Sequence, residues 1–244
     1  MSTPASSSPR WIAALILSLG IFAGLAVLGV ALGESALRFK EYERSVTVKG
    51  LAEREMPADI VLWPIQYTAA KNDLAALYSK LEQDSNQIRE YLLTSGIDPA
   101  EISISPPRVT DKLAQQYGEP SRIALRYTAV QTLTVYSKNV DHVRKTLEGL
   151  AILGKQGIAF TGGDYQNQIQ YLFTHLNEVK PEMVEEATRN GRSVALKFAK
   201  DSDSALGKIK RANQGTFSIT SRDSQTPYIK KIRVVSTIEY YLSD

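Results

Sequence analysis

The first strong feature in the pattern of apolar and polar positions is the uncharged run from Trp11 to Gly33. A helix rises about 1.5 Å per residue, so roughly 20 apolar residues cross the hydrocarbon core of a bilayer. A cleavable signal peptide has a shorter apolar stretch, about 7–15 residues, before a small-x-small site such as Ala31-Leu32-Gly33. The length favours an uncleaved transmembrane signal anchor over residues 11–33, after a disordered cytoplasmic tail over residues 1–10, with a cleaved signal as the alternative.

The charges beside the span do not fix its orientation. Arg38, Lys40 and Arg44 lie in the juxtamembrane linker over residues 34–44, whereas Arg10 and the terminal amine precede the span. Counting basic residues alone keeps the large domain in the cytoplasm. Large domains translocate largely regardless of charge, so this count does not exclude a periplasmic domain.

Two glycines inside the span have the spacing of a helix–helix contact. Gly20 and Gly24 form a GxxxG pattern, which lets two helix backbones approach closely because side chains are missing there. Glycine is also common in transmembrane helices without any such contact. We therefore treat the pair as a candidate contact between helices.

The first half of the remaining chain alternates between strand and helix periodicities. A strand is expected from Val61 to Ala69, and Pro64 within it indicates a sheet edge or a bulge. An amphipathic helix follows and ends near Gly96, and a short strand at Ile102 and Ile104 stops before Pro106-Pro107. The apolar stripe of this helix is Leu74, Leu77, Tyr78, Leu81, Ile88 and Leu92.

The second half continues in the same way. Asn139 is expected to cap a helix that follows a long strand, and Pro181 is expected in the first turn of a helix over about residues 178–200. The apolar face of the long strand is Ile123, Leu125, Tyr127, Ala129, Leu133 and Val135. The stripe after Asn139 is Val140, Val143, Leu147 and Leu150, and that of the longest helix is Val184, Ala187, Gly191, Val194 and Phe198. Further strands are expected around Tyr165–Phe173, Lys208–Ile219 and Ile229–Leu242.

The order of these elements predicts the fold class. Pairs of adjacent strands between single helices favour an α+β domain over residues 45–244, with a largely antiparallel sheet, rather than a doubly wound parallel sheet. Strands such as the last one have a polar side opposite an apolar side, which indicates helices packed on one face only. Gly191 lies on an apolar stripe, so it indicates close approach of a strand or another helix.

Charge and composition exclude several classes of function. A formal net charge of +3 is too small to indicate nucleic-acid binding. The chain has no cysteine, which excludes disulfides, thiol catalysis and thiolate metal sites.

Three local motifs resemble functional sites and fail. Gly149 to Lys155 match a phosphate-binding loop, but Gln156 replaces its hydroxyl residue and the glycines end a helix, so a helix C-cap is expected. Asp201 and Asp203 begin like a calcium loop that lacks its later ligands, so a solvated helix end is expected. His142 and His175 have no ligand-spaced partner in sequence and are interpreted as surface or turn histidines, so no metal, cofactor or catalytic residue is expected.

Two basic clusters lie on the last strands. They consist of Lys208, Lys210 and Arg211, and of Lys230, Lys231 and Arg233. Charge on strand edges discourages wrong pairing, which is one interpretation. The other is contact with anionic lipid headgroups or an acidic polymer, because the domain lies beside a bilayer.

The C-terminal region resembles a known family. The segments LNEVKPEMVEEATRNGRSVALKFAKDS, LGKIKRANQGTFSI and IKKIRVVSTIEYYL look like the C-terminal half of a SIMPL-domain protein, and SVTVKGLAEREMPADIVLWPI is similar to the family's start. The resemblance implies an α+β domain able to self-associate, in some relatives into ring- or channel-like assemblies. It also implies a bacterial envelope protein, and some relatives are linked to oxidative-stress resistance, but it supplies no catalytic residues.

These observations together predict a non-enzymatic protein of the bacterial inner membrane. We expect a single span, a periplasmic C-terminal domain, and a function through homo-oligomers or an envelope protein partner, without nucleic acid. The alternatives are an enzyme whose site is dispersed in sequence, and a module that binds lipid or an anionic polymer through the basic strands.

Overall fold

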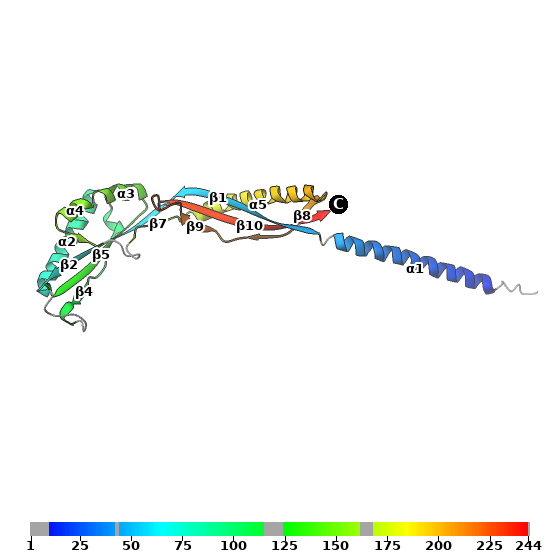
Figure 1. The fold of residues 1–244 in the computed structure, drawn as a ribbon, viewed down its shortest axis with the longest axis horizontal. Helices are drawn as coiled ribbons and strands as arrows, with labels where there is room; N and C mark the ends of the chain where they lie inside the picture. The colour runs from blue at the N-terminus through cyan, green and yellow to red at the C-terminus, as the bar shows by residue number, and fades with distance from the viewer. Residues whose placement is uncertain (1–9, 42–43, 115–123, 162–167, 244) are drawn as a thin grey trace, which may run out of the picture. The chain divides into compact units, whose positions relative to one another are not determined.

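The computed structural model describes residues 10–41, 44–114, 124–161 and 168–243 (Figure 1). The chain divides into two compact units. Unit 1 comprises Met1–Ala52, Met183–Thr216 and Val234–Asp244, and unit 2 comprises Glu53–Glu182 and Phe217–Arg233. Both are built from antiparallel strands with packed helices, which confirms the α+β fold class.

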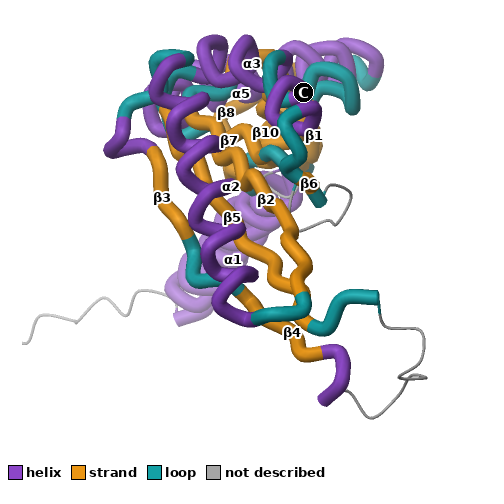
Figure 2. Tube along the Cα trace, turned by 90° about the vertical axis from the view of Figure 1, so that its left-hand side faces the viewer, coloured by secondary structure: helices purple, strands orange, loops and turns teal. Residues whose placement is uncertain are grey.

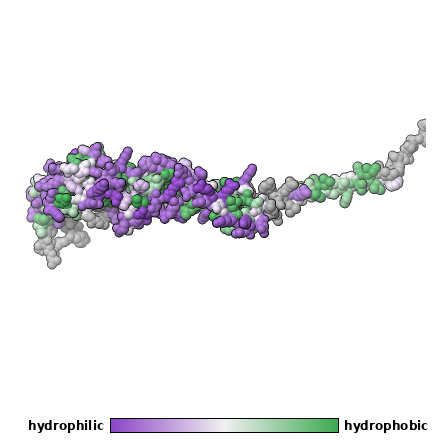
Figure 3. Space-filling view, turned by 90° about the horizontal axis from the view of Figure 1, so that it is seen from above, coloured by the Kyte–Doolittle hydropathy of each residue, from purple (hydrophilic) through white to green (hydrophobic). Residues whose placement is uncertain are grey.

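The N-terminal run forms the helix α1 (Arg10–Glu41). Its window Ala14–Ser35 has a mean hydropathy of 2.6, and none of it is buried. In Figure 3 the described residues of α1 are coloured mainly as hydrophobic. A helix of this length and composition can cross a membrane, either as an anchor or as a signal sequence.

Unit 2 is organised around one sheet of strands in the order β3-β5-β2-β6, with β4 also paired to β5 and β7 also paired to β2. The strands β2 (Ile60–Lys71) and β5 (Tyr127–Ser137) pair over their whole common length. The shorter strands are β3 (Ile102–Ile104), β4 (Arg108–Asp111), β6 (Ala159–Phe160) and β7 (Gln170–Leu172). The short turns η1 (Pro99–Glu101) and η2 (Lys112–Ala114) precede β3 and follow β4.

The helix α2 (Leu74–Thr94) packs along β2 and β5, as Figure 2 shows. Its start is capped by Asp73, whose side chain accepts a hydrogen bond from the Ala76 N–H. Gly96 follows the helix with a φ of +90°, which confirms the predicted end. Leu74 and Tyr78 of the predicted stripe are exposed instead, and the buried apolar side chains of α2 are Leu77, Leu81, Ile88 and Leu92.

The prediction that Pro64 marks a sheet edge or a bulge is wrong. Strand β2 lies inside the sheet, and its pairing with β5 is regular through Pro64. The Gln66 carbonyl accepts a hydrogen bond from the Thr161 N–H at 2.9 Å beside β6. Residues two apart in a strand direct their backbone to the same side, so the missing donor of Pro64 faces the interval between β6 and β7.

The helix α3 (Val140–Glu148) begins as predicted, because the Asn139 side chain accepts from the His142 N–H. It ends at Gly149, and the short helix α4 (Ala151–Lys155) follows. The Tyr91 hydroxyl donates to the Thr146 carbonyl at 2.6 Å. A Cβ added at Gly149 would lie 2.3 Å from that hydroxyl, so a side chain there would have to displace Tyr91 from this hydrogen bond.

The second sheet has the strand order β1 (Ser45–Pro57), β10 (Ile229–Ser243), β8 (Ala205–Gln214). Strand β9 (Ser218–Ser221) also pairs with β10. The strand predicted over Lys208–Ile219 is therefore two strands. Gly215 separates them, and its N–H donates to the Val235 carbonyl at 2.9 Å. An added Cβ at Gly215 would lie 2.5 Å from that same oxygen.

The helix α5 (Leu176–Asp201) belongs to unit 1 from Met183 onward. It begins before the predicted residue, so Pro181 lies beyond the first turn. The predicted buried stripe is partly wrong, because Val194 and Phe198 are 38% and 54% exposed. The buried positions of the helix within unit 1 are Met183, Ala187, Gly191, Ala195 and Ala199. Small side chains at four-residue spacing let the helix lie close to the strands beneath it.

Candidate functional site

The two span glycines lie on the exposed surface of α1. A Cβ added at Gly20 or Gly24 would meet no described atom within 4 Å. Their face is therefore open within one chain, as a contact between helices of two chains requires. The helix–helix contact itself stays a prediction.

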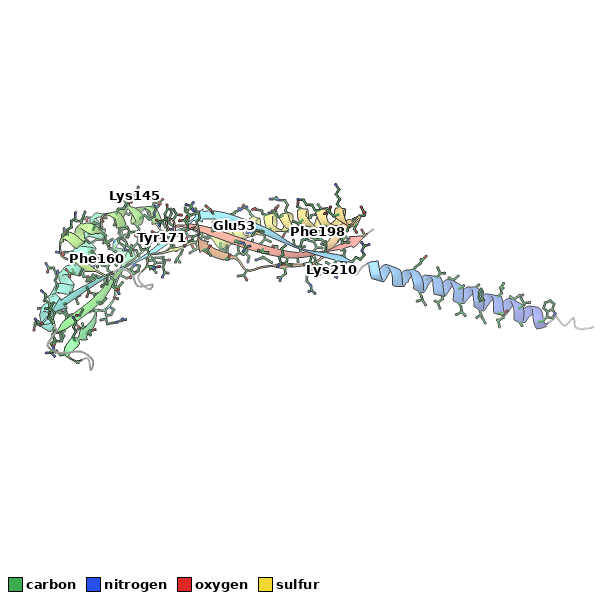
Figure 4. All side chains as sticks on the ribbon, viewed as in Figure 1. Glu53, Lys145, Phe160, Tyr171, Phe198 and Lys210 are labelled. Atoms are coloured by element: carbon green, nitrogen blue, oxygen red, sulfur yellow. The ribbon has the colours of Figure 1, made fainter. Side chains whose placement is uncertain are left out.

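The first basic cluster lies on β8 in unit 1. Lys210 Nζ lies 3.1 Å from Glu239 Oε1, and Ser45 donates to the same oxygen at 2.7 Å. The hydrogen bonds from Ser45 and Lys210 lower the pKa of Glu239, and the charge of Arg211 contributes. Figure 4 labels Lys210 on β8. Two of the residues predicted to contact an anionic surface, Lys210 and Arg211, thus already interact with a carboxylate of the chain, whereas Lys208 has no ion pair among the described residues.

The second basic cluster lies on β10 in unit 2 and is also engaged. Lys231 Nζ lies 2.5 Å from Glu53 Oε1, and Arg233 Nε lies 3.9 Å from Glu53 Oε2. Lys230 is buried, donates to Ser221 Oγ at 3.0 Å, and has a pKa lowered by that burial. These internal contacts account for the cluster without an external anion. The strand-edge interpretation is wrong for it, because β10 lies between other strands of its sheet and pairs with β9 at these residues.

His175 has a carboxylate partner that the sequence did not indicate. Its Nδ1 lies 2.5 Å from Asp59 Oδ2, a residue distant in sequence. Asp59 also accepts hydrogen bonds from the N–H and the hydroxyl of Thr174. Burial raises the pKa of Asp59, but these bonds and the charge of His175 outweigh it and lower the pKa overall. Asp59 thereby ties the β1–β2 turn to the segment that leads into α5.

His142 is not an ordinary surface residue either. Its Nε2 is buried and has no hydrogen-bond partner in the described part of the chain. The ring lies against Gly96, where an added Cβ would be 3.1 Å from Nε2. Within the same described residues, no group of three or more His, Asp or Glu side chains has the arrangement of a metal site.

The failed motifs have the structures that their sequences predict. Gly149 is the C-cap of α3, so the segment resembling a phosphate-binding loop is a helix end. Asp201 ends α5, and Asp203 has a φ of 51°, which the short side chain of aspartate tolerates. Both results agree with the helix-end interpretations.

A groove between α5 and β8 in unit 1 was not predictable from the sequence. Its volume is about 650 Å³. The helix contributes Glu185, Thr188, Arg189 and Arg192, and the strands contribute Gly207, Lys208, Ile209 and Tyr240. Lys208 was noted as part of a basic strand, but nothing in the sequence indicates that it lies beside two arginines of a helix. The period of α5 places Arg189 and Arg192 on one face, which is the only signal that the sequence offered.

Three large apolar side chains of unit 1 are also exposed. Leu196 and Phe198 of α5 and Ile209 of β8 are each about half exposed, with values of 51%, 54% and 48%. Figure 4 labels Phe198 on α5.

Comparison with curated proteins finds no match. A family model described as "SIMPL: Protein of unknown function (DUF541)" matches residues 46–237. The match begins at the start of β1 and ends within β10, so it covers the strands and helices of both units but not α1. The chain therefore belongs to the SIMPL family.

Proposed function

We propose that this protein is a single-pass protein of the bacterial inner membrane that acts without catalysis, through self-assembly or by binding an envelope protein in the periplasm. The observation that carries the proposal is α1. Its window of 22 residues is apolar and entirely unburied, so the chain offers it no protein environment. A bilayer supplies the missing apolar environment. Stress resistance is the cellular setting that resemblance to the family suggests.

Strand β7 supports the assembly part of the proposal. It pairs with β2 on one side, and no other described strand pairs with it. Its three residues, Gln170 to Leu172, carry no charge. An uncharged edge strand can add a strand from a second molecule through its free backbone groups.

Strand β8 is less suited to the same purpose. It is also the last strand in its sheet path, but Lys208, Lys210 and Arg211 lie along it. Antiparallel pairing of two copies of β8 would bring these cations together, and like charges on paired strands are destabilising. We therefore place the self-association edge in unit 2 rather than on β8.

The mass of the native particle tests the proposal. The full chain is extracted in a nonionic detergent, and its native mass is compared with the intact mass of one chain from the same sample. We expect a multiple of the chain mass or a complex with an envelope protein. A monomer without any partner, at cellular concentrations and in fresh extracts, would contradict the proposal.

The second candidate function is binding of an anionic lipid or polymer. The specific observation in its favour is that Lys208 makes no ion pair in the described part of the chain, unlike the neighbouring Lys210. Binding of this kind becomes weaker as salt increases, because exposed charges are screened within about 10 Å at 0.1 M salt. Flotation with anionic vesicles at two salt concentrations separates it from assembly, which depends less on salt.

A further inference from the structure

The groove between α5 and β8 has an excess of positive charge. Arg189, Arg192 and Lys208 line it, and Glu185 is the one carboxylate among its lining residues. In the described part of the chain, none of the three cations forms an ion pair or a hydrogen bond through its side chain. Lys210, elsewhere in unit 1, differs from them because it forms an ion pair with Glu239. The groove cations are therefore available to an external anion.

One residue of the groove lining has a buried hydroxyl. Tyr240 is 2% exposed and is among the residues that line the groove. Its hydroxyl has no hydrogen-bond partner among the described residues. A buried polar group without a partner destabilises a protein, so such groups indicate a missing ligand atom or water. An acceptor oxygen of a ligand in the groove would satisfy this donor.

The strand that forms one wall is irregular at the groove. Glu239 pairs with Arg211 and Tyr240 with Ile209, so Lys210 is an extra residue on β8. A second register shift separates the pairs Tyr240–Ile209 and Leu242–Leu206. Such bulges re-aim side chains and are common beside binding sites. Two of them flank Ile209, next to Tyr240.

We propose that this groove binds a small phosphorylated molecule, a phosphate monoester with an apolar body. Arginine presents a planar set of donors that matches phosphate oxygens, and the charge of a monoester dianion matches three cations better than a single carboxylate does. Ile209, which is 48% exposed, supplies apolar surface for the rest of the molecule. A volume of about 650 Å³ lies within the usual range for small-molecule sites. This proposal does not depend on self-assembly.

Calorimetric titration of the full chain in a nonionic detergent tests the proposal, with inorganic phosphate and phenyl phosphate as probes. We expect both to bind and phenyl phosphate to bind several-fold more tightly, because its ring contacts the apolar wall. The double variant R189Q/R192Q should weaken phenyl phosphate binding by about tenfold or more. The variant K197Q/K200Q removes two charges from the same helix outside the groove, and its affinity should change by less than about twofold.

Tyr240→Phe provides a test that does not rely on charge. Removing an unpartnered hydroxyl should leave the thermal stability of the ligand-free chain unchanged or raise it. The same variant should bind phenyl phosphate about three- to tenfold more weakly, because the hydrogen bond to the ligand is lost. Unchanged binding by Tyr240→Phe, or equal losses in R189Q/R192Q and K197Q/K200Q, would overturn the proposal.

A competition experiment identifies the source of the phosphate. The chain is placed in nanodiscs of phosphatidylcholine, with or without phosphatidic acid, whose headgroup is a phosphate monoester, and titrated with phenyl phosphate. Loss of phenyl phosphate binding only in the anionic nanodiscs supports a lipid headgroup as the occupant. Equal binding in both supports a free phosphate monoester. Binding in neither, although the chain is folded, contradicts a phosphate site.

Discussion

Gly50 on β1 and Gly191 on α5 are in direct contact, with the backbone of the strand against the backbone of the helix. A Cβ added at Gly50 would lie 1.8 Å from the Ala187 carbonyl oxygen and 2.5 Å from the Gly191 nitrogen. A Cβ added at Gly191 would lie 3.1 Å from the Ile238 Cδ1 atom and 3.4 Å from the Gly50 nitrogen. The expectation that Gly191 permits close approach is confirmed, and the approaching element is a strand.

Alanine substitutions at these two positions should differ strongly in effect. Gly50→Ala should destabilise the protein by about 3 kcal/mol or more, because its Cβ meets backbone atoms that cannot move aside. Gly191→Ala should change stability by less than about 1 kcal/mol. The tip of Ile238 can shift, and alanine favours a helix by about 1 kcal/mol over glycine. Thermal unfolding of both variants measures the difference, and equal effects would contradict the contact.

Asp59 should contribute stability that depends on pH. Its pKa is below the usual value of 3.8 in the folded chain, so its contribution is present above about pH 4 and decreases as the pH falls through the folded pKa. Asp59→Asn should reduce stability at pH 7 by about 1–3 kcal/mol, because Thr174 and His175 lose a charged acceptor. The difference from the unchanged chain should be smaller at pH 3.

Unfolding with urea at both pH values measures this effect. Asp201→Asn, which removes an exposed carboxylate at the end of α5, is the control for the loss of one negative charge. A difference for Asp59→Asn that is the same at pH 7 and pH 3 would show that charge plays no part.

His175→Ala tests whether the His175–Asp59 pair is catalytic. The His175 side chain is 55% exposed, and a histidine held by a carboxylate is the arrangement of many general bases. We expect a modest loss of stability and no loss of cellular function, because the pair joins a turn to the start of a helix. The other two candidate side chains, His142 and Lys155, should also tolerate alanine without loss of function. A folded His175→Ala chain that is inactive in cells would favour the enzyme alternative.

The span should remain attached to the mature protein. An apolar window from Ala14 to Ser35 exceeds the core of an ordinary signal peptide. After carbonate washing we expect the protein in the membrane fraction, with an intact mass that begins at or near residue 1. A soluble chain that starts near Glu34 would establish the cleaved alternative.

The soluble part, cut at about Tyr42, should form homo-oligomers. A standard specific interface buries about 1,600 Å², which is enough for association at micromolar concentration. Leu172→Lys places a charge on the β7 edge and should reduce the oligomer, whereas Leu93→Lys on α2 should not, although the two leucines are 38% and 39% exposed. Light scattering measures the mass. A monomeric truncated chain would falsify this prediction and leave the contact at Gly20 and Gly24 as the route to assembly.

Residues that follow a simple period were predictable from the sequence. The cap at Asn139, the strand Val61–Ala69 and the helix end near Gly96 depend on local chemistry, and the structure has each of them. The position of Pro64 inside the sheet was not predictable. It depends on which side of β2 the segments β6 and β7 occupy, and that is a property of the whole sheet. Two parts of the predicted strands lie outside the described residues. They are Tyr165 to Asn167, in the strand predicted over Tyr165–Phe173, and Ile123, at the start of the long strand.

The buried stripe of α5 shows a second limit. Hydrophobicity favours Val194 and Phe198 as inward positions, but Ala195 and Ala199 are buried instead, where their small side chains let α5 lie close to the strands. Asp84 is a further case. It is almost completely buried on α2, where Lys80 pairs with it at 2.6 Å, and a charged residue is not expected in a core from sequence alone.

The groove was beyond prediction for the same reason. Arg192 and Lys208 are distant in sequence, and only the packing of α5 along β8 brings them to one site. Tyr240 lies in the last predicted strand, Ile229–Leu242. That its hydroxyl would lack a partner depends on which side chains surround it, and no sequence pattern reports this.

The Tyr91 hydroxyl occupies the space that a side chain at residue 149 would need. In a phosphate-binding loop, the absence of a side chain leaves room for a nucleotide beside the backbone. In this chain the same room is filled from within by a tyrosine of α2, which also binds the end of α3 through Thr146. Gly149 therefore allows two helices of the same chain to pack together. A chain that kept Gly149 but lost Tyr91 would have an empty space at this position, not a nucleotide site.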